Sequence, residues 1–204
     1  FLPGPARAAG TPVPAAPGAA VSVSGAWMDV FPGTAPYNLI LLSLDTTRSD
    51  RLSCYGFAKA TSPNLDRLAA DGILFEDAYT PVPVTLPAHT TMMTGLYPFE
   101  HGVRNNGSYV VAPKTVTLAE LLKNRGYTTG AILGAFPLEN RFGLNQGFDT
   151  YDDEFPAESV YREVDLAQRK ASEVSRLALA WLDRRKGGPF FLWCHYYDPH
   201  APHQ

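Results

Sequence analysis

Cysteine is nearly absent from this chain, which has two in 204 residues. Cys54 and Cys194 lie far apart in the sequence, and neither has a second cysteine at the spacing of a zinc or redox motif. The sequence therefore gives no indication of a disulfide framework or of a zinc site built on cysteine. Both cysteines are predicted to be buried free thiols.

A strong net charge and long apolar runs are also lacking. The formal net charge is −3, so no electrostatic attraction to nucleic acid or to an anionic membrane is expected. No apolar stretch approaches the length of a membrane span. With 45% hydrophobic residues, a chain of this length can bury a core, and the composition indicates a globular protein.

Composition divides the chain into two parts. Residues 1–36 are rich in Pro, Ala and Gly, and they are expected to form a linker or tail because they cannot bury enough surface to offset the entropy of ordering. In residues 37–204, strand-like and helix-like patterns alternate. This alternation predicts an α/β sandwich around a mostly parallel sheet.

Asp45 follows the first of these strand-like runs. Tyr37 to Leu44 is almost continuously apolar, which is typical of a strand that is buried on both faces. Open α/β sheets bind ligands beyond the carboxyl ends of their strands, where Asp45 would lie. An ordinary turn aspartate is the alternative, but a carboxylate here would suit a hard divalent cation.

Thr85 stands at the start of a predicted helix over 85–94. Thr85 is a suitable N-cap, Pro87 fits the first turn, and Gly95 is placed to end the helix. Free backbone N–H groups and the helix dipole favour an anion at such a position. Thr85 is thus a candidate nucleophile towards a phosphate or sulfate ester, and a simple capped core helix is the alternative.

Other segments are predicted from capping signals and apolar periodicity. Helices are expected over 62–72, 117–126 and 162–186, and strands over 73–80, 127–133 and 189–196. The segment 143–153 is expected to be a structured loop with solvated acidic residues. Arg48 and Asp50 are expected to form a local ion pair or turn contact.

Two parts of the helix segment carry a family resemblance. Thr-Leu-Pro-Ala-His at 85–89 and Met-Thr-Gly-Leu-Tyr-Pro at 93–98 resemble the signature of the sulfatase family of the alkaline-phosphatase superfamily. The resemblance extends from Tyr37 to the end of the chain. It implies an alkaline-phosphatase-like sandwich, a divalent metal ion (Ca, Zn or Mn) held partly by Asp45 and Thr85, and an exported or membrane-tethered protein.

Two further segments match the family pattern. His-Gly-Val-Arg-Asn-Asn at 101–106 suggests that Asn106 contacts a substrate oxygen, whereas Arg104 is either a second substrate contact or a structural ion-pair partner. Asp-Pro-His at 198–200 makes His200 the candidate for binding or protonating an ester oxygen. His195, inside a predicted strand, is expected to be a core histidine, and His203 is left without an assignment.

The chain also departs from the family pattern. Thr46 stands where sulfatases usually have a second adjacent acid, and Gly134 to Pro137 replace a segment that often supplies a Lys and a His. Established sulfatases convert a Cys or Ser nucleophile to formylglycine, and threonine cannot give that aldehyde. An unmodified Thr85 is more typical of the phosphoryl-transferring relatives.

The function predicted from these features is a metal-dependent hydrolase of the sulfatase family, acting on sulfate or phosphate esters of small molecules, glycans or lipids through Thr85. A phosphodiesterase or a phosphoglycerol- or phosphoethanolamine-type transferase is the first alternative. A non-catalytic sulfatase-like binding domain is the second. The chain is interpreted as the N-terminal part of a longer catalytic domain, which alone is expected to be inactive.

Overall fold

The computed structural model describes residues 37–155 and 168–201, all of which belong to one compact unit, Tyr37–Gln204. The predicted tail at 1–36, the predicted start of a helix at Arg162 and the position of His203 lie outside the described residues.

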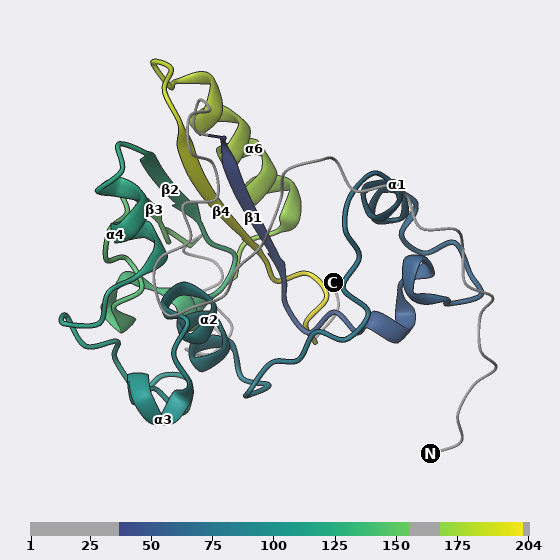
Figure 1. Ribbon diagram of the computed structural model, residues 1–204, viewed down its shortest axis with the longest axis horizontal. Helices are drawn as coiled ribbons and strands as arrows, with labels where there is room; N and C mark the ends of the chain where they lie inside the picture. Colours follow the sequence, from purple (N-terminus) through teal and green to yellow (C-terminus); the bar gives the residue numbers. More distant parts are fainter. Residues whose placement is uncertain (1–36, 156–167, 202–204) are drawn as a thin grey trace, which may run out of the picture. The chain divides into compact units, whose positions relative to one another are not determined.

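A parallel four-stranded sheet runs through the described fold (Figure 1). The strands are β1 (Leu39–Leu44), β2 (Thr128–Ile132), β3 (Thr150–Asp152) and β4 (Phe190–Tyr196). Their order is β1-β4-β2-β3, and all three pairings are parallel. The predicted α/β class with a mostly parallel sheet is confirmed.

Strand β4 lies between β1 and β2, and its side chains alternate between two hydrophobic clusters. Phe191 and Trp193 belong to one cluster, whereas Leu192 and Cys194 belong to the other. Both faces of this strand are therefore buried. This explains why its sequence is a continuous apolar run, as in other doubly covered parallel strands.

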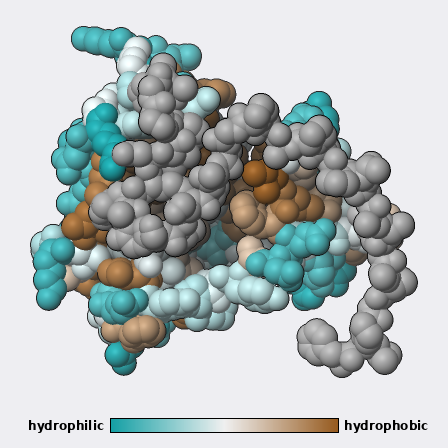
Figure 2. Space-filling view, in the orientation of Figure 1, coloured by the Kyte–Doolittle hydropathy of each residue, from teal (hydrophilic) through white to brown (hydrophobic). Residues whose placement is uncertain are grey.

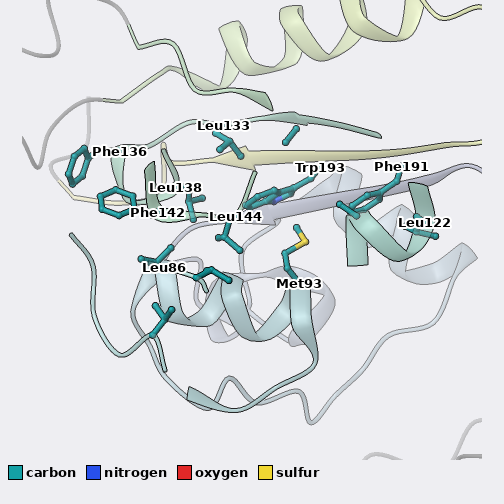
Figure 3. Packing of buried hydrophobic residues seen from close by; sticks show 14 residues of the cluster. Leu86, Met93, Leu122, Leu133, Phe136, Leu138, Phe142, Leu144, Phe191 and Trp193 are labelled. Carbon is teal, nitrogen blue, oxygen red and sulfur yellow. The ribbon is translucent and has the colours of Figure 1, made fainter. Parts of the chain in front are cut away.

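Helices cover both faces of the sheet. The described helices are α1 (Pro63–Asp71), α2 (Thr85–Thr94), α3 (Pro98–His101), α4 (Leu118–Lys123) and α6 (Ala171–Asp183). Of these, α2, α4 and α6 contribute buried residues to the clusters beside the sheet, whereas α3 packs on α2. Figure 3 shows α2 below the sheet, with Leu86 and Met93 directed towards Trp193. On the other face, Val174, Ala178 and Trp181 of α6 are buried against β4 and β2.

Strand β1 is less buried than predicted. Ile40, Leu42 and Leu44 are 55%, 51% and 38% exposed. Among the described residues β1 is an edge strand, and α6 packs on β4 and β2 instead. Only its other face is partly covered, where Leu41 packs against the core.

The predicted strand over 73–80 is wrong. The structure has no strand there, and Ile73, Phe75 and Tyr79 are 82%, 68% and 87% exposed. The surface in view in Figure 2 mixes hydrophobic and hydrophilic regions. A β-favouring sequence forms a strand only when a neighbouring strand pairs with it, and none of the described strands does so here.

Two other predictions also need correction. In the described residues, the helix predicted from 162 begins only at Ala171, after Gln168 has formed an isolated bridge with Ala135. The segment 143–153 contains β3, and its acids are not simply solvated. Asp149 forms an ion pair with Lys123, and Asp152 with Arg169, whose side chain is almost fully buried.

Gly147 provides a test of the packing between this segment and α4. Its φ is +86°, and an added Cβ would lie 2.2 Å from the backbone nitrogen of Glu120. Gly147→Ala should lower the free energy of unfolding by about 3 kcal/mol or more, because left-handed strain and backbone overlap add. Urea titration of the purified protein measures this change.

Gly126→Ala is the matched control. Gly126 also has a positive φ, +83°, but nothing lies within 4 Å of an added Cβ. The free energy of unfolding of Gly126→Ala should fall by only about 1–2 kcal/mol, because backbone strain is the only cost. Equal losses in the two variants would contradict the close approach of Gly147 to α4.

Candidate active site

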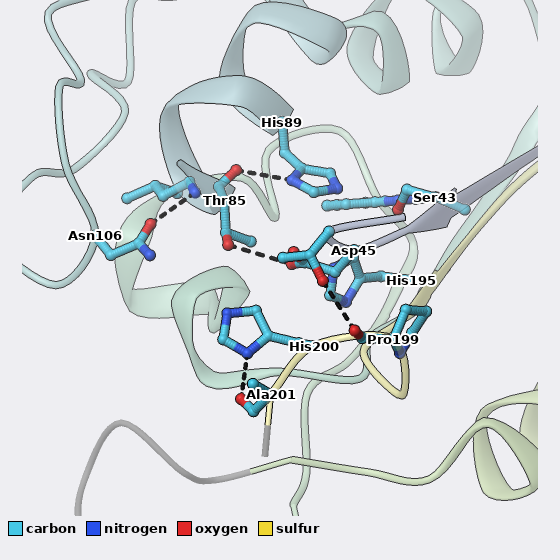
Figure 4. A network of polar contacts seen from close by, with 12 residues as sticks. Ser43, Asp45, Thr85, His89, Asn106, His195, Pro199, His200 and Ala201 are labelled. Atoms are coloured by element: carbon cyan, nitrogen blue, oxygen red, sulfur yellow. Dashed lines mark hydrogen bonds and ion pairs between the residues drawn. The ribbon is translucent and has the colours of Figure 1, made fainter. Parts of the chain in front are cut away.

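Asp45 is the centre of a polar network at the carboxyl edge of the sheet (Figure 4). Its backbone N–H donates to the carbonyl oxygen of Tyr196 at 2.9 Å, so the residue after β1 is held against the end of β4. The side chain of Asp45 thus has the strand-end position that the sequence predicted.

Two donors converge on one oxygen of Asp45. Thr85 Oγ1 and His195 Nε2 both lie 3.2 Å from Asp45 Oδ2, although they are 40 and 150 positions away in sequence. Neither contact uses Oδ1. The arrangement therefore fixes the orientation of the carboxylate through one oxygen and leaves the other out of these two bonds.

The environment of Asp45 favours its ionised form. Burial alone would raise the pKa of this carboxyl, but the hydrogen bond and the electrostatic attraction of His195 outweigh the burial, and the Thr85 bond acts in the same direction. The net result is a pKa below the usual range. At neutral pH Asp45 is an anionic oxygen donor.

Thr85 is the first residue of α2 rather than its N-cap. Val84 holds the N-cap position and makes no side-chain capping bond, so the prediction that Thr85 is the N-cap was wrong. The Thr85 hydroxyl is therefore not used to cap the helix. It donates to Asp45 instead, beside the positive end of the helix dipole.

Asn106 satisfies a free N–H of the same helix end. Its Oδ1 accepts a hydrogen bond from the Leu86 backbone nitrogen at 2.8 Å, which places the side-chain amide beside Thr85. Because Oδ1 is occupied, the amide nitrogen is the group that remains for a substrate oxygen. Arg104 is exposed and makes no hydrogen bond or ion pair with another described residue.

His89 packs beneath this helix end as a neutral side chain. It is 5% exposed, and its Nδ1–H donates to the Thr85 carbonyl oxygen at 2.7 Å. Burial, followed by the nearby His195, lowers the pKa of His89 to about 3. The rings of Trp193 and His195 lie 5.5 and 5.0 Å from it, so His89 supports the first turn of α2 from the core.

His195 is buried as predicted, but its contact with Asp45 was missed. It is fully buried in β4, and the parallel register pairs it with Ser43, two residues before Asp45. Because a carboxylate only accepts hydrogen bonds, Nε2 carries the proton in this contact. Pairing β4 with β1 in the sequence would have revealed the contact, but strand order cannot be read from one sequence.

His200 lies in the turn after β4. Its backbone N–H donates to the Tyr197 carbonyl at 2.9 Å, and its ring stacks on Tyr197 with centroids 4.4 Å apart. Its Nδ1–H donates to the Ala201 carbonyl oxygen, so Nε2 is the free ring nitrogen. His200 forms no direct hydrogen bond with Asp45 or Thr85 in the described structure.

Several residues named from the sequence lie outside this network. Arg48 and Asp50 form the expected local ion pair, with both side chains exposed. Cys54 and Cys194 are free thiols, and burial raises the pKa of Cys194 to about 11. Cys54 is only partly buried, which corrects its prediction as a buried thiol.

Residues 37–155 and 168–201 contain neither a cluster of metal-ligating side chains nor a helix that could span a membrane. No group of three or more His, Cys, Asp or Glu side chains is arranged to hold a metal ion. No helix in these ranges has the length and apolar character that a membrane crossing requires.

A family model described as Sulfatase matches residues 37–204. Human arylsulfatase A is 35% identical over 128 residues, which cover 57% of this chain and 25% of that protein. Human N-acetylgalactosamine-6-sulfatase is 29% identical, and the match covers 82% of this chain and 40% of that protein. The chain thus spans well under half the length of these curated relatives.

Among solved structures, the chain is similar to BT4656 in complex with D-glucosamine-2-N,6-O-disulfate. The TM-score is 0.68 and the identity 23%, with 81% of this chain and 35% of that chain covered. This similarity supports the fold alone.

The neutral state of His89 predicts a pH dependence of stability. Its pKa is lowered from 6.5 to about 3, so acidification protonates His89 in the unfolded chain before the folded one. The stabilising contribution is complete above pH 6.5 and declines as the pH falls towards 3. The decline should reach about 1.4 kcal/mol per pH unit, measured as the free energy of unfolding in urea.

His89→Asn is the comparison variant, since its amide can still donate to the Thr85 carbonyl but does not titrate. Its unfolding free energy should be lower at neutral pH and flatter between pH 6.5 and about 4. Parallel curves for the two proteins over this interval would show that His89 is protonated in the folded state.

Proposed function

The chain belongs to the sulfatase family, and from this membership we propose that it carries the nucleophile of an ester hydrolase or transferase that acts on sulfate or phosphate esters. The contact of Thr85 Oγ1 with Asp45 Oδ2, 3.2 Å long at the N-terminal end of α2, is the observation that carries this proposal. It joins a nucleophilic hydroxyl, an anionic acceptor and a helix end suited to a tetrahedral oxyanion.

The residues at this edge fit a hard divalent cation. Asp45 offers an ionised carboxylate, held through Oδ2, and Thr85 offers a hydroxyl oxygen at the same place. When bound, such an ion would acidify the threonine hydroxyl and stabilise negative charge on the ester oxygens. Calcium, zinc and manganese all remain candidates, and further ligands are needed beyond those of the described residues.

The reaction that these side chains support is a two-step displacement. Thr85 Oγ1 passes its proton to Asp45 Oδ2 and bonds to the phosphorus or sulfur atom as the bond to the leaving oxygen breaks. A His200 ring protonated on both nitrogens supplies the leaving oxygen with a proton from Nε2, and both protons are returned when the threonine ester is cleaved. The amide nitrogen of Asn106 donates to a non-bridging oxygen. A water molecule, or the hydroxyl of an acceptor in the transferase alternative, then cleaves the threonine ester.

Phosphate esters fit Thr85 better than sulfate esters do. Oxidising a secondary alcohol gives a ketone, so Thr85 cannot become the aldehyde that established sulfatases use. The fold accommodates phosphorus chemistry elsewhere, because it is shared with a phosphonate monoester hydrolase from Agrobacterium radiobacter, at a TM-score of 0.65 and 24% identity. We therefore propose phosphoryl transfer as the finer assignment and sulfate hydrolysis as the alternative.

A sulfatase-like binding domain without catalysis is the second candidate function. It is favoured by the single carboxylate at the Asp45 site and by Gly134, whose segment supplies neither a Lys nor a His to this edge. Small-molecule, glycan or lipid esters are proposed as ligands in either case. Export or membrane tethering is proposed from family membership alone.

Thr85→Ala tests the nucleophile. In the full-length, metal-loaded protein, turnover of an aryl phosphodiester should fall by about a thousandfold or more, because no attacking oxygen remains. Thr85→Ser, which keeps a hydroxyl, should retain measurable turnover. An aryl sulfate assayed in parallel decides the ester class, and turnover that survives Thr85→Ala would exclude Thr85 as nucleophile.

Asp45→Asn tests the cation site independently of activity. Removing the charge at constant shape should raise the Mn²⁺ dissociation constant of the full-length protein by at least about tenfold, measured by isothermal titration calorimetry. Asp50→Asn is the control, because Asp50 pairs with Arg48 at the surface and should leave the affinity unchanged. Unaltered affinity in Asp45→Asn would remove Asp45 from the metal shell.

A further inference from the structure

Thr46 has a backbone conformation that its side chain disfavours. Its φ is +51°, and it is the single non-glycine residue with a positive φ among residues 37–155 and 168–201. Left-handed φ values are rare for residues other than Gly, Asn and Asp, and a β-branched residue there is a true outlier. Such outliers cluster at functional sites, where the surrounding structure maintains them.

The turn that contains Thr46 does not by itself call for threonine. The Thr47 backbone nitrogen donates to the Leu44 carbonyl at 3.4 Å, so Thr46 is the third residue of a four-residue turn that leaves β1. Turns with a positive φ at this place favour Gly or Asn. The turn therefore accounts for the positive φ at position 46, but it does not account for a threonine there.

A hydrogen bond of the Thr46 hydroxyl explains why threonine occupies this position. Thr46 Oγ1 donates to the carbonyl oxygen of Pro199 at 3.1 Å, across 153 positions of sequence. Asp45 immediately precedes the donor, and His200 immediately follows the acceptor. One hydrogen bond thus joins the turn that carries Asp45 to the turn that carries His200.

Three other contacts of the His200 turn are made within the turn or with α6. Asp198 Oδ1 accepts from the Ala171 backbone nitrogen at 3.0 Å, which attaches the turn to the start of α6. The His200 N–H bond and the ring stack both end on Tyr197, within the turn itself. Strands β1 and β4 are last joined by the bond from Asp45 N to Tyr196 O, three residues before Pro199.

We propose that Thr46 is a positioning residue, whose hydroxyl holds the 198–200 turn against the end of β1 and so fixes His200 relative to Asp45 and Thr85. The part of this inference that concerns activity rests on the proposed function. The part that concerns the place of His200 does not. The hydroxyl, and not the shape of the side chain, is the group that acts.

Four variants separate the effects of the hydroxyl, the side-chain shape and the backbone strain. Thr46→Ser keeps the hydroxyl, Thr46→Val keeps the shape without it, and Thr46→Gly removes both the hydroxyl and the backbone strain. Thr47→Val is the matched control, because it makes the same chemical change at the next residue. The Thr47 hydroxyl is buried and has no hydrogen-bond partner in the described structure.

The first measurement follows the His200 ring by NMR in the full-length protein. Stacking on Tyr197 at 4.4 Å displaces the His200 ring-proton shifts from their free values, and His200→Gln identifies these signals. Thr46→Val and Thr46→Gly should move them towards the free values, whereas Thr46→Ser and Thr47→Val should leave them in place. Unmoved signals in Thr46→Val and Thr46→Gly would overturn the proposal.

The second measurement compares stability with turnover. Thr46→Gly should have a Tm at or above that of the wild type, because left-handed strain is released, and yet a kcat about tenfold lower at a similar KM. Thr46→Ser, which keeps the hydroxyl, should have a kcat close to that of the wild type. If Tm and kcat both fall in Thr46→Gly while the His200 ring-proton signals do not change, Thr46 has only a structural role.

The two measurements keep the proposals apart. If the wild-type protein turns over no ester but the His200 signals respond to the Thr46 variants as expected, the positioning role stands and the proposed function fails. If turnover depends on Thr85 while neither the His200 signals nor kcat responds to Thr46→Gly, the proposed function stands and the positioning role fails.

Discussion

The parallel register between β1 and β4 determines where Asp45 lies relative to His195 and to the turn that carries His200. Leu44 pairs with Tyr196, and the Asp45 backbone continues the pairing by one more bond. A shift of one residue would send His195 to the opposite face of the sheet and remove it from Asp45. The register is protected by burial, since both faces of β4 are covered by hydrophobic clusters.

The site places a single ionised carboxylate beside a largely apolar core. His195, which contacts Asp45, packs against the neutral His89, and His89 in turn packs against Trp193. Two hydrogen-bond donors stabilise the charge of Asp45 from the protein side. Because both donors use the same oxygen, the carboxylate is oriented without being fully satisfied by them. This is the condition under which a buried acid can still bind a cation or a polar ligand.

The sequence predicted the parts of this arrangement that depend on local patterns. Strand β4, the helix that carries Thr85 and the strand-end position of Asp45 follow from apolar runs and from the proline and glycine near the ends of that helix, although the N-cap was predicted one residue too late. Features that depend on neighbours were missed. The segment at 73–80 has β-favouring residues but no partner strand, and β1 is an apolar run at an edge. The contact of His195 with Asp45 depends on strand order, which no single segment encodes.

The sequence separations within the site have a consequence for how the protein is made. Thr85 reaches Asp45 across 40 positions, but His195 and the Pro199 carbonyl reach the same turn across 150 and 153. A nascent chain on the ribosome therefore carries Asp45 without its histidine donor until almost all of this sequence has been synthesised. Formation of the site coincides with insertion of the last described strand, a late, non-local step of the kind that slows folding.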